Sequence, residues 1–211
     1  VYDSAGIATI ENGQICRRRA EGKIVCLEGL ISKNPVGGTI GIGHTRWATH
    51  GVPNERNAHP HGDQRVVLVH NGIIENFQEL RDQLETEGHQ FQTDTDTETV
   101  VHLISGYLSK GKTPQNAVSK SLSLLKGAFA LAVLFAGEDG LMIGARRGSP
   151  LAIGYGDGEM YLGSDAMALA PLTQRICYLE EGDWAEITNE GAKIYDVNGQ
   201  IKKRKIRETS V

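Results

Sequence analysis

The chain has 211 residues, and its 22 lysines and arginines against 26 aspartates and glutamates give a formal net charge of −4 at pH 7. This length fits one large domain or two small ones, and either can bury a hydrophobic core without disulfides or metals. A hydrophobic fraction of 39% and a charged fraction of 23% are typical of a folded globular chain and argue against disorder or a fibre. The mild acidity argues against binding to nucleic acid.

The cysteine content and the hydropathy pattern indicate the compartment. Three cysteines (Cys16, Cys26 and Cys177) are too few for a disulfide framework, which favours a reducing environment. The strongest apolar run, 128–136, is shorter than the about 20 residues that a membrane-spanning helix needs. Residues 1–15 do not have the pattern of a signal peptide. We therefore expect a cytoplasmic protein that does not associate with membranes.

The first part of the chain predicts a β-hairpin and a long loop. Asn12-Gly13 is a dipeptide that closes two-residue hairpins. Residues 45–63 contain Pro53 and Pro60 and predict an irregular loop, which in a compact domain is usually functional. The elements predicted before this loop are strands at 6–10 and 15–19, a helix within 22–31 and a strand at 39–44.

A buried strand and three helices are predicted next. The continuous apolar run at 65–70 is typical of a strand buried on both faces, and we expect it to end at Asn71-Gly72. Gly88 is placed to end the first helix, and the second begins near 95–97. The third has Thr113 as its N-cap and Pro114 at its first position.

The second half predicts mostly strands, which makes the class α+β with mostly antiparallel sheets. Ser164 is expected to cap a short helix at 165–169, and Asn198-Gly199 predicts a hairpin turn. The predicted strands are 128–136, 141–146, 151–155 and 160–163, followed by an antiparallel meander of 176–179, 183–187, 193–197 and 200–206.

Asn71-Gly72 is the first candidate for chemistry. An asparagine amide and a neighbouring glycine N–H are donors that can converge on one oxygen, as in an oxyanion hole. The alternative is a simple Asn-Gly turn, which the dipeptide alone favours.

Arg46 and Asp96 are candidates for holding the two charges of an amino acid. A guanidinium suits a carboxylate, and Thr49 and His50 can add a hydroxyl and a backbone N–H to the same anion. Asp96 can pair with an ammonium group. The alternatives are a solvated surface arginine and an aspartate that caps a helix.

Two other function classes compete with this clamp. His59-Pro60-His61 has the spacing of a cupin-type metal pair, within a group formed by His44, His50, His59, His61 and His70. Its carboxylate neighbours lie in a loop rather than at strand ends, which disfavours a metal site. A non-catalytic amino-acid-sensing module also stays open, because none of the three cysteines has an evident base beside it.

Taken together, these segments resemble the glutaminase domain of the glucosamine-6-phosphate synthase family (glutamine:fructose-6-phosphate amidotransferases, isomerising). The resemblance covers nearly the whole chain in the family's order. Its main motifs are GHTRWATHG at 43–51, NAHPH at 57–61, HNGIIENF at 70–77 and TDTE at 95–98, with YDSAG at 2–6, GSPL at 148–151, SD at 164–165 and LEEGD at 179–183. The amidophosphoribosyltransferase type, or the glutamate or asparagine synthase type, is the alternative within the same fold.

The resemblance implies a fold, a reaction and a site. The fold is the N-terminal-nucleophile hydrolase type, a four-layer αββα sandwich of two antiparallel sheets between helices. The family's domain releases ammonia from L-glutamine, and a separate sugar-isomerase domain adds it to fructose-6-phosphate; no cofactor or metal is implied, and the whole enzyme is expected to be a homo-oligomer. By motif, Asn71 and Gly72 form the oxyanion hole, and Arg46, Thr49 and His50 hold the glutamine α-carboxylate. Asp96 takes the α-ammonium group, and Trp47 lies in the loop that closes the site.

One departure from the family is large. The family's nucleophile is an N-terminal cysteine whose own α-amino group is the base, and Val1 cannot replace it. We expect the chain to lack the family's first strand and first helix, which leaves a sheet edge exposed, and to be inactive as given. Residues 1–200 are expected to form the glutaminase domain, and residues 201–211 its last strand and the start of a linker to an absent sugar-isomerase domain.

Overall fold

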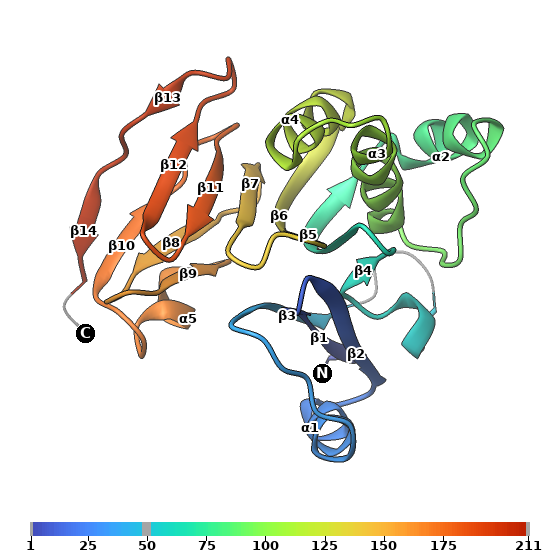
Figure 1. Cartoon of the computed structure of the whole chain (residues 1–211), viewed down its shortest axis with the longest axis horizontal. Helices are drawn as coiled ribbons and strands as arrows, with labels where there is room; N and C mark the ends of the chain where they lie inside the picture. The colour runs from blue at the N-terminus through green and yellow to red at the C-terminus, as the bar shows by residue number, and fades with distance from the viewer. Residues whose placement is uncertain (1, 48–51, 210–211) are drawn as a thin grey trace.

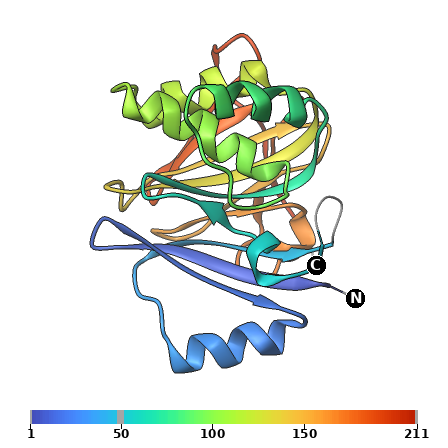
Figure 2. The ribbon, with the colours of Figure 1, turned by 90° about the vertical axis from the view of Figure 1, so that its right-hand side faces the viewer.

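A computed structural model describes residues 2–47 and 52–209 as two layers of antiparallel sheet between helices (Figures 1 and 2). In Figure 2, the green helices α2 to α4 cover one outer face and the blue helix α1 covers the other. This is the predicted four-layer α+β sandwich.

The first sheet layer is one seven-stranded sheet with the order β13-β12-β11-β7-β6-β5-β4. Its longest strands, β5 and β6, pair antiparallel along nine residues each. The strands are β4 (His61–Gly62), β5 (Val66–Ile74), β6 (Gly127–Phe135), β7 (Met142–Arg147), β11 (Trp184–Thr188), β12 (Gly191–Tyr195) and β13 (Ile201–Lys202).

The second layer consists of a three-stranded sheet, β2-β1-β3, and a four-stranded sheet, β14-β10-β8-β9. Asn12 and Gly13 both have positive φ in the turn between β1 and β2, as the hairpin prediction requires. The strands are β1 (Ser4–Glu11), β2 (Gln14–Glu21), β3 (Ile40–Arg46), β8 (Ala152–Tyr155), β9 (Met160–Gly163), β10 (Arg175–Tyr178) and β14 (Ile206–Glu208).

Local sequence signals correctly mark the start of α4 and the end of α2. Thr113 accepts the N–H of Asn116 at the start of α4, and Gly88 follows α2 with a positive φ of 94°. None of the helices in the described ranges has the length and apolar character needed to cross a lipid bilayer. The helices are α1 (Ile24–Lys33), α2 (Phe77–Thr86), α3 (Thr97–Ser109), α4 (Pro114–Leu124) and α5 (Ala166–Leu169), with a 3-10 turn at η1 (Glu55–Asn57).

β5 links the hydrophobic clusters on the two sides of the seven-stranded sheet. Val66 and Leu68 pack in the cluster under α2 to α4, whereas Val67 and Val69 pack against β1 and β3. All four residues are buried, which confirms the prediction of a strand covered on both faces. This packing fixes β5 between the helices and the three-stranded sheet. The residues at its C-terminal end, Asn71 and Gly72, therefore lie close to both layers.

Two local predictions are wrong. β5 does not end at Asn71-Gly72; it stays paired with β6 as far as Ile74, because Gly72 adopts a φ of 121° inside the ladder. A Cβ at this position would overlap the carbonyl oxygen of Ala128. Asp165, rather than Ser164, caps α5, because its carboxylate accepts the N–H groups of Met167 and Ala168.

The predicted meander and last strand also differ from the structure. Only β11, β12 and β13 form a meander, since β10 and β14 pair with each other in the four-stranded sheet. The predicted strand at 200–206 is therefore two short strands in two sheets. Arg204 lies between them and donates two hydrogen bonds to Asp183, at 2.9 and 2.8 Å.

Candidate active site

A cavity of about 390 Å³ lies where β3, β5 and the start of α3 meet. Five of the residues predicted from the sequence line it: Arg46, Trp47, Asn71, Gly72 and Asp96. Thr49 and His50, which the sequence also predicts, lie outside the described residues. Trp47 is 68% exposed at the rim, with its ring centre 6.1 Å from that of Tyr2.

Arg46 ends β3 and brings a buried positive charge to the cavity. Its side chain is nearly inaccessible, and its Nη1 lies 3.5 Å from Asp3 Oδ1 and 3.5 Å from the carbonyl oxygen of Val52. The backbone N–H of Asp3, the residue before β1, donates to the Arg46 carbonyl, so a backbone hydrogen bond also joins this pair. The pair fixes the guanidinium at one side of the cavity, where a planar anion can meet it.

Asp96 brings a buried negative charge to the same cavity. It precedes α3, but its carboxylate makes no capping hydrogen bond to that helix. Its Oδ2 instead accepts the N–H of Ile74, the last residue of β5, at 2.8 Å. The helix-cap alternative is therefore wrong as an account of the side chain, because the carboxylate is bound to β5 rather than to its own helix.

Asn71 is held on β5 with its amide oriented. His44 Nε2 lies 2.7 Å from Asn71 Oδ1. Burial is the main factor that lowers the pKa of His44, and the resulting neutral imidazole can donate its Nε2–H to this oxygen. The Asn71 Nδ2–H₂ group is then available to an oxygen in the cavity.

His44 is a candidate for orienting Asn71 in the site. The sequence analysis considered it only as a member of a possible metal-binding group. It shares the cavity with Asn71 and Arg46. It lies two residues before Arg46 on β3, and residues two apart on a strand point to the same face. That period-two relation is the signal that could have assigned His44 to the site.

The histidines pack ring against ring. The rings of His44 and His59 stack with centres 4.1 Å apart, and that of His61 lies 4.7 Å from His59. His61 Nε2 lies 3.3 Å from Thr95 Oγ1, and His70 Nδ1 lies 2.9 Å from Thr97 Oγ1. Within the described residues, no group of three or more potential ligands has an arrangement that could hold a metal ion. The hydrogen bonds of His44 Nε2, His61 Nε2 and His70 Nδ1 go to three separate partners, Asn71, Thr95 and Thr97.

Because this histidine cluster is buried, we expect the folded chain to lose stability at acidic pH. Burial, followed by the nearby Arg19 and Arg17 guanidinium groups, lowers the pKa of His61 from 6.5 to about 3. Between these values the unfolded chain binds a proton that the folded chain does not, so the free energy of unfolding falls as the pH falls. At pH 5 we expect a loss of about 2 kcal/mol from His61 alone.

Chemical denaturation at pH 7 and pH 5 measures this loss. His61→Gln keeps a hydrogen-bonding side chain near Thr95 but does not titrate, so its stability should depend less on pH. An unchanged pH dependence in this variant would contradict the assignment.

Within the described chain, no cysteine lines the cavity. Cys26 is exposed on α1, and Cys16 is half-buried on β2. Cys177 is buried on β10, where burial raises the pKa of its thiol. None of the three is placed to attack a ligand held between Arg46 and Asp96.

A groove of about 420 Å³ adjoins the cavity and shares His44, His70 and Asn71 with it. Its sides are β3 and β9, and its floor includes Val69 and Met142 of the seven-stranded sheet. In the described sheets, β3 pairs only with β1 and β9 only with β8. Two strand edges therefore border the groove.

Comparison with known proteins agrees with this geometry. The family model described as "Glutamine amidotransferase domain" matches residues 44–171, which span the cavity. The chain belongs to this family. It is therefore an amidotransferase domain, and the residues that line its cavity lie largely within the matched region.

Curated relatives extend the comparison to nearly the whole chain. The glutamine–fructose-6-phosphate aminotransferase (isomerizing) of Brucella suis is 61% identical over 208 residues, which is 99% of this chain and 34% of that protein. The enzyme of the same name from Zymomonas mobilis is 58% identical over 205 residues. The chain spans about a third of the length of these relatives.

Solved structures share the fold. The glutamine phosphoribosylpyrophosphate amidotransferase of B. subtilis, complexed with ADP and GMP, superposes with a TM-score of 0.78 at 30% identity, over 95% of this chain and 44% of that one. A glutamine aminotransferase class-II domain protein from Silicibacter pomeroyi superposes with a TM-score of 0.64 at 17% identity, over 91% and 90% of the two chains. The fold is thus that of the N-terminal-nucleophile hydrolases, as the sequence predicts.

Proposed function

We propose that the cavity binds L-glutamine and that the chain is the ammonia-releasing part of a glutamine–fructose-6-phosphate aminotransferase. The observation that carries this proposal is the presence of Arg46 and Asp96, of opposite charge and each 3% exposed, in one cavity with Asn71. Arg46 pairs with the α-carboxylate, together with Thr49 and His50, and Asp96 pairs with the α-ammonium group. The side-chain amide of glutamine then extends toward β5.

Asn71 and Gly72 act on the amide carbonyl. When a thiolate attacks the carbonyl carbon, the π electrons move to oxygen, and the Asn71 Nδ2–H₂ group stabilises the resulting oxyanion. Collapse of this intermediate expels ammonia once the nitrogen has been protonated, and leaves a thioester that water hydrolyses. Trp47, at the rim, covers the bound glutamine.

The nucleophile is an N-terminal cysteine with its own α-amino group as base, supplied from outside residues 1–211. We place its segment as an extended strand in the groove between β3 and β9, where both edges can pair with it and one end reaches Asn71. A sugar-isomerase domain in the same polypeptide uses the ammonia, and the whole enzyme is a cytoplasmic homo-oligomer. No step requires a cofactor.

The identity to the aminotransferases, 57–61% against 30% for the phosphoribosylpyrophosphate amidotransferase, supports fructose-6-phosphate as the acceptor rather than phosphoribosylpyrophosphate. A non-catalytic amino-acid-binding module would use the same charge clamp. The two differ in whether a supplied thiol restores turnover.

The test compares two chains. Residues 1–211 alone should bind L-glutamine weakly and release no ammonia from it. The same residues preceded by an N-terminal segment whose first residue is cysteine should hydrolyse glutamine. Ammonia release by residues 1–211 alone, or glutamine binding without turnover in the extended chain, would contradict the proposal.

A further inference from the structure

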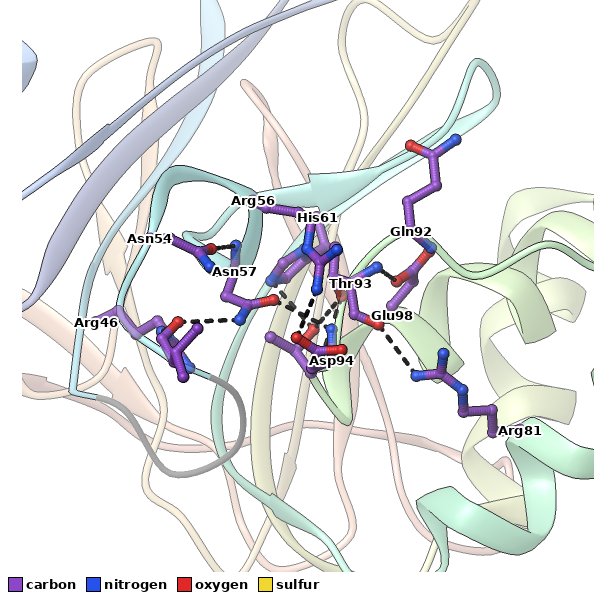
Figure 3. A network of polar contacts seen from close by, with 12 residues as sticks. Arg46, Asn54, Arg56, Asn57, His61, Arg81, Gln92, Thr93, Asp94 and Glu98 are labelled. Carbon is purple, nitrogen blue, oxygen red and sulfur yellow. Dashed lines mark hydrogen bonds and ion pairs between the residues drawn. The ribbon is translucent and has the colours of Figure 1, made fainter.

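Two chain segments border the cavity and carry its opposite charges. One comprises Arg46 and the described residues from Val52 to η1, and the other runs from Gln92 to Asp96. Figure 3 shows the polar side chains that lie between them. Asn57, the first residue of the NAHPH motif, is fully buried at this junction and has no part in the proposed chemistry.

Asn57 contacts both segments through the two ends of its amide. Its Nδ2 donates to the carbonyl oxygen of Val52 at 3.0 Å, and its Oδ1 accepts the N–H of Asp94 at 3.1 Å (Figure 3). Its own backbone N–H is bound by Asn54 Oδ1 at 2.8 Å, which fixes the turn that presents the amide. One side chain thus joins the backbone of Val52 to the backbone of Asp94, which lies 37 residues after Asn57 in sequence.

On the carboxylate side, Asn57 and Arg46 share an acceptor. Val52 O accepts from Asn57 Nδ2 and lies 3.5 Å from Arg46 Nη1. The position of this carbonyl therefore links the Asn57 amide to the guanidinium that faces the cavity.

On the ammonium side, side chains of α2 and α3 bind the backbone of the segment before Asp96. Glu98 accepts the N–H groups of Gln92 and Thr93, at 2.8 and 2.7 Å, and Arg81 Nη1 donates to the carbonyl of Thr93 at 3.0 Å. These bonds fix the segment to its own helical layer but do not reach Arg46. Asn57 binds this segment at the backbone N–H of Asp94, two residues before Asp96.

A second link across the junction lies at the surface. Arg56 Nη2 is 2.6 Å from Asp94 Oδ2, but both side chains are more than half exposed. An exposed ion pair of this kind contributes little to stability. The buried amide of Asn57 is therefore the stronger of these two connections.

We propose that Asn57 is a positioning residue that sets the separation between the carboxylate-binding and ammonium-binding halves of the cavity. This inference rests on the proposed binding of glutamine. A ligand that carries both α-charges must bridge a fixed separation, so it gains from the preorganisation that Asn57 supplies. A ligand with only the carboxylate binds without regard to where Asp96 lies.

The test measures the binding of two ligands to the 211-residue chain: L-glutamine, and glutaramate, which is glutamine without its α-amino group. Asn57→Ala should weaken L-glutamine about tenfold, since it removes both hydrogen bonds of a buried amide, and should change glutaramate binding much less. Asn57→Asp keeps the volume and the acceptor for Asp94 but loses the donor to Val52, so it should show the same selective loss.

Arg56→Gln is the matched control, because it breaks the surface link between the same two segments. It should leave the affinities for both ligands nearly unchanged. Equal losses for the two ligands in the Asn57 variants, or no loss, would overturn the positioning role. If the wild-type chain binds neither ligand, the proposed function itself fails, and this outcome is distinct from the other two.

Discussion

Asn71→Ala is expected to lower the rate constant for glutamine hydrolysis by about 100- to 1,000-fold in the chain extended with a nucleophilic cysteine. The Asn71 amide is oriented by His44, at 2.7 Å, so its Nδ2–H₂ group meets a developing oxyanion without having to reorganise. The neutral amide of bound glutamine needs this donor much less than the oxyanion does. The KM for glutamine should therefore change little, while kcat falls.

Asn76→Ala is a matched control for this variant. Asn76 is an asparagine five residues further along the chain, and its amide bonds to the backbone of Leu124 and Lys126 rather than lining the cavity. This substitution can reduce stability but should leave kcat nearly unchanged. A rise in KM with an unchanged kcat in Asn71→Ala would show that Asn71 binds the ground state and would exclude its proposed role.

The position of Asn71 shows which features can be predicted from the sequence and which cannot. The apolar run at 65–70 correctly predicts a strand buried on both faces, because that pattern is local. The continuation of β5 to Ile74 depends on pairing with β6, whose residues lie more than fifty positions away. An Asn-Gly dipeptide that usually ends a strand is here held inside a ladder by a distant partner.

Asp96 and His44 show the same limit within the site. Asp96 has the local sequence of a helix cap, but its carboxylate accepts the N–H of Ile74, at the end of strand β5. In sequence, His44 is one of several histidines in a metal-like pattern, and only the packing of β3 against β5 brings it to Asn71. Sequence motifs can nominate Arg46, Asn71 and Asp96, but only the packing of the three-stranded sheet on the seven-stranded sheet shows that they share a cavity.

Asp96→Asn is expected to weaken the binding of L-glutamine by about 100-fold while leaving glutaramate binding nearly unchanged. The substitution keeps the shape of the side chain and an oxygen that can accept the Ile74 N–H, but it removes the negative charge. A buried, charge-assisted hydrogen bond to an ammonium group contributes about 2–3 kcal/mol, which corresponds to this loss in affinity. Glutaramate has no ammonium group, so it is insensitive to the missing charge.

Asp94→Asn separates this effect from a general loss of negative charge. Asp94 lies two residues before Asp96, and its exposed carboxylate pairs with Arg56 at the surface. The Asp94→Asn variant should bind L-glutamine within about twofold of wild type, because exposed pairs contribute little. Isothermal titration of both ligands to both variants measures the difference. Asp96 would have no role as the ammonium partner if Asp96→Asn bound L-glutamine as tightly as wild type, or if glutaramate lost affinity to the same extent.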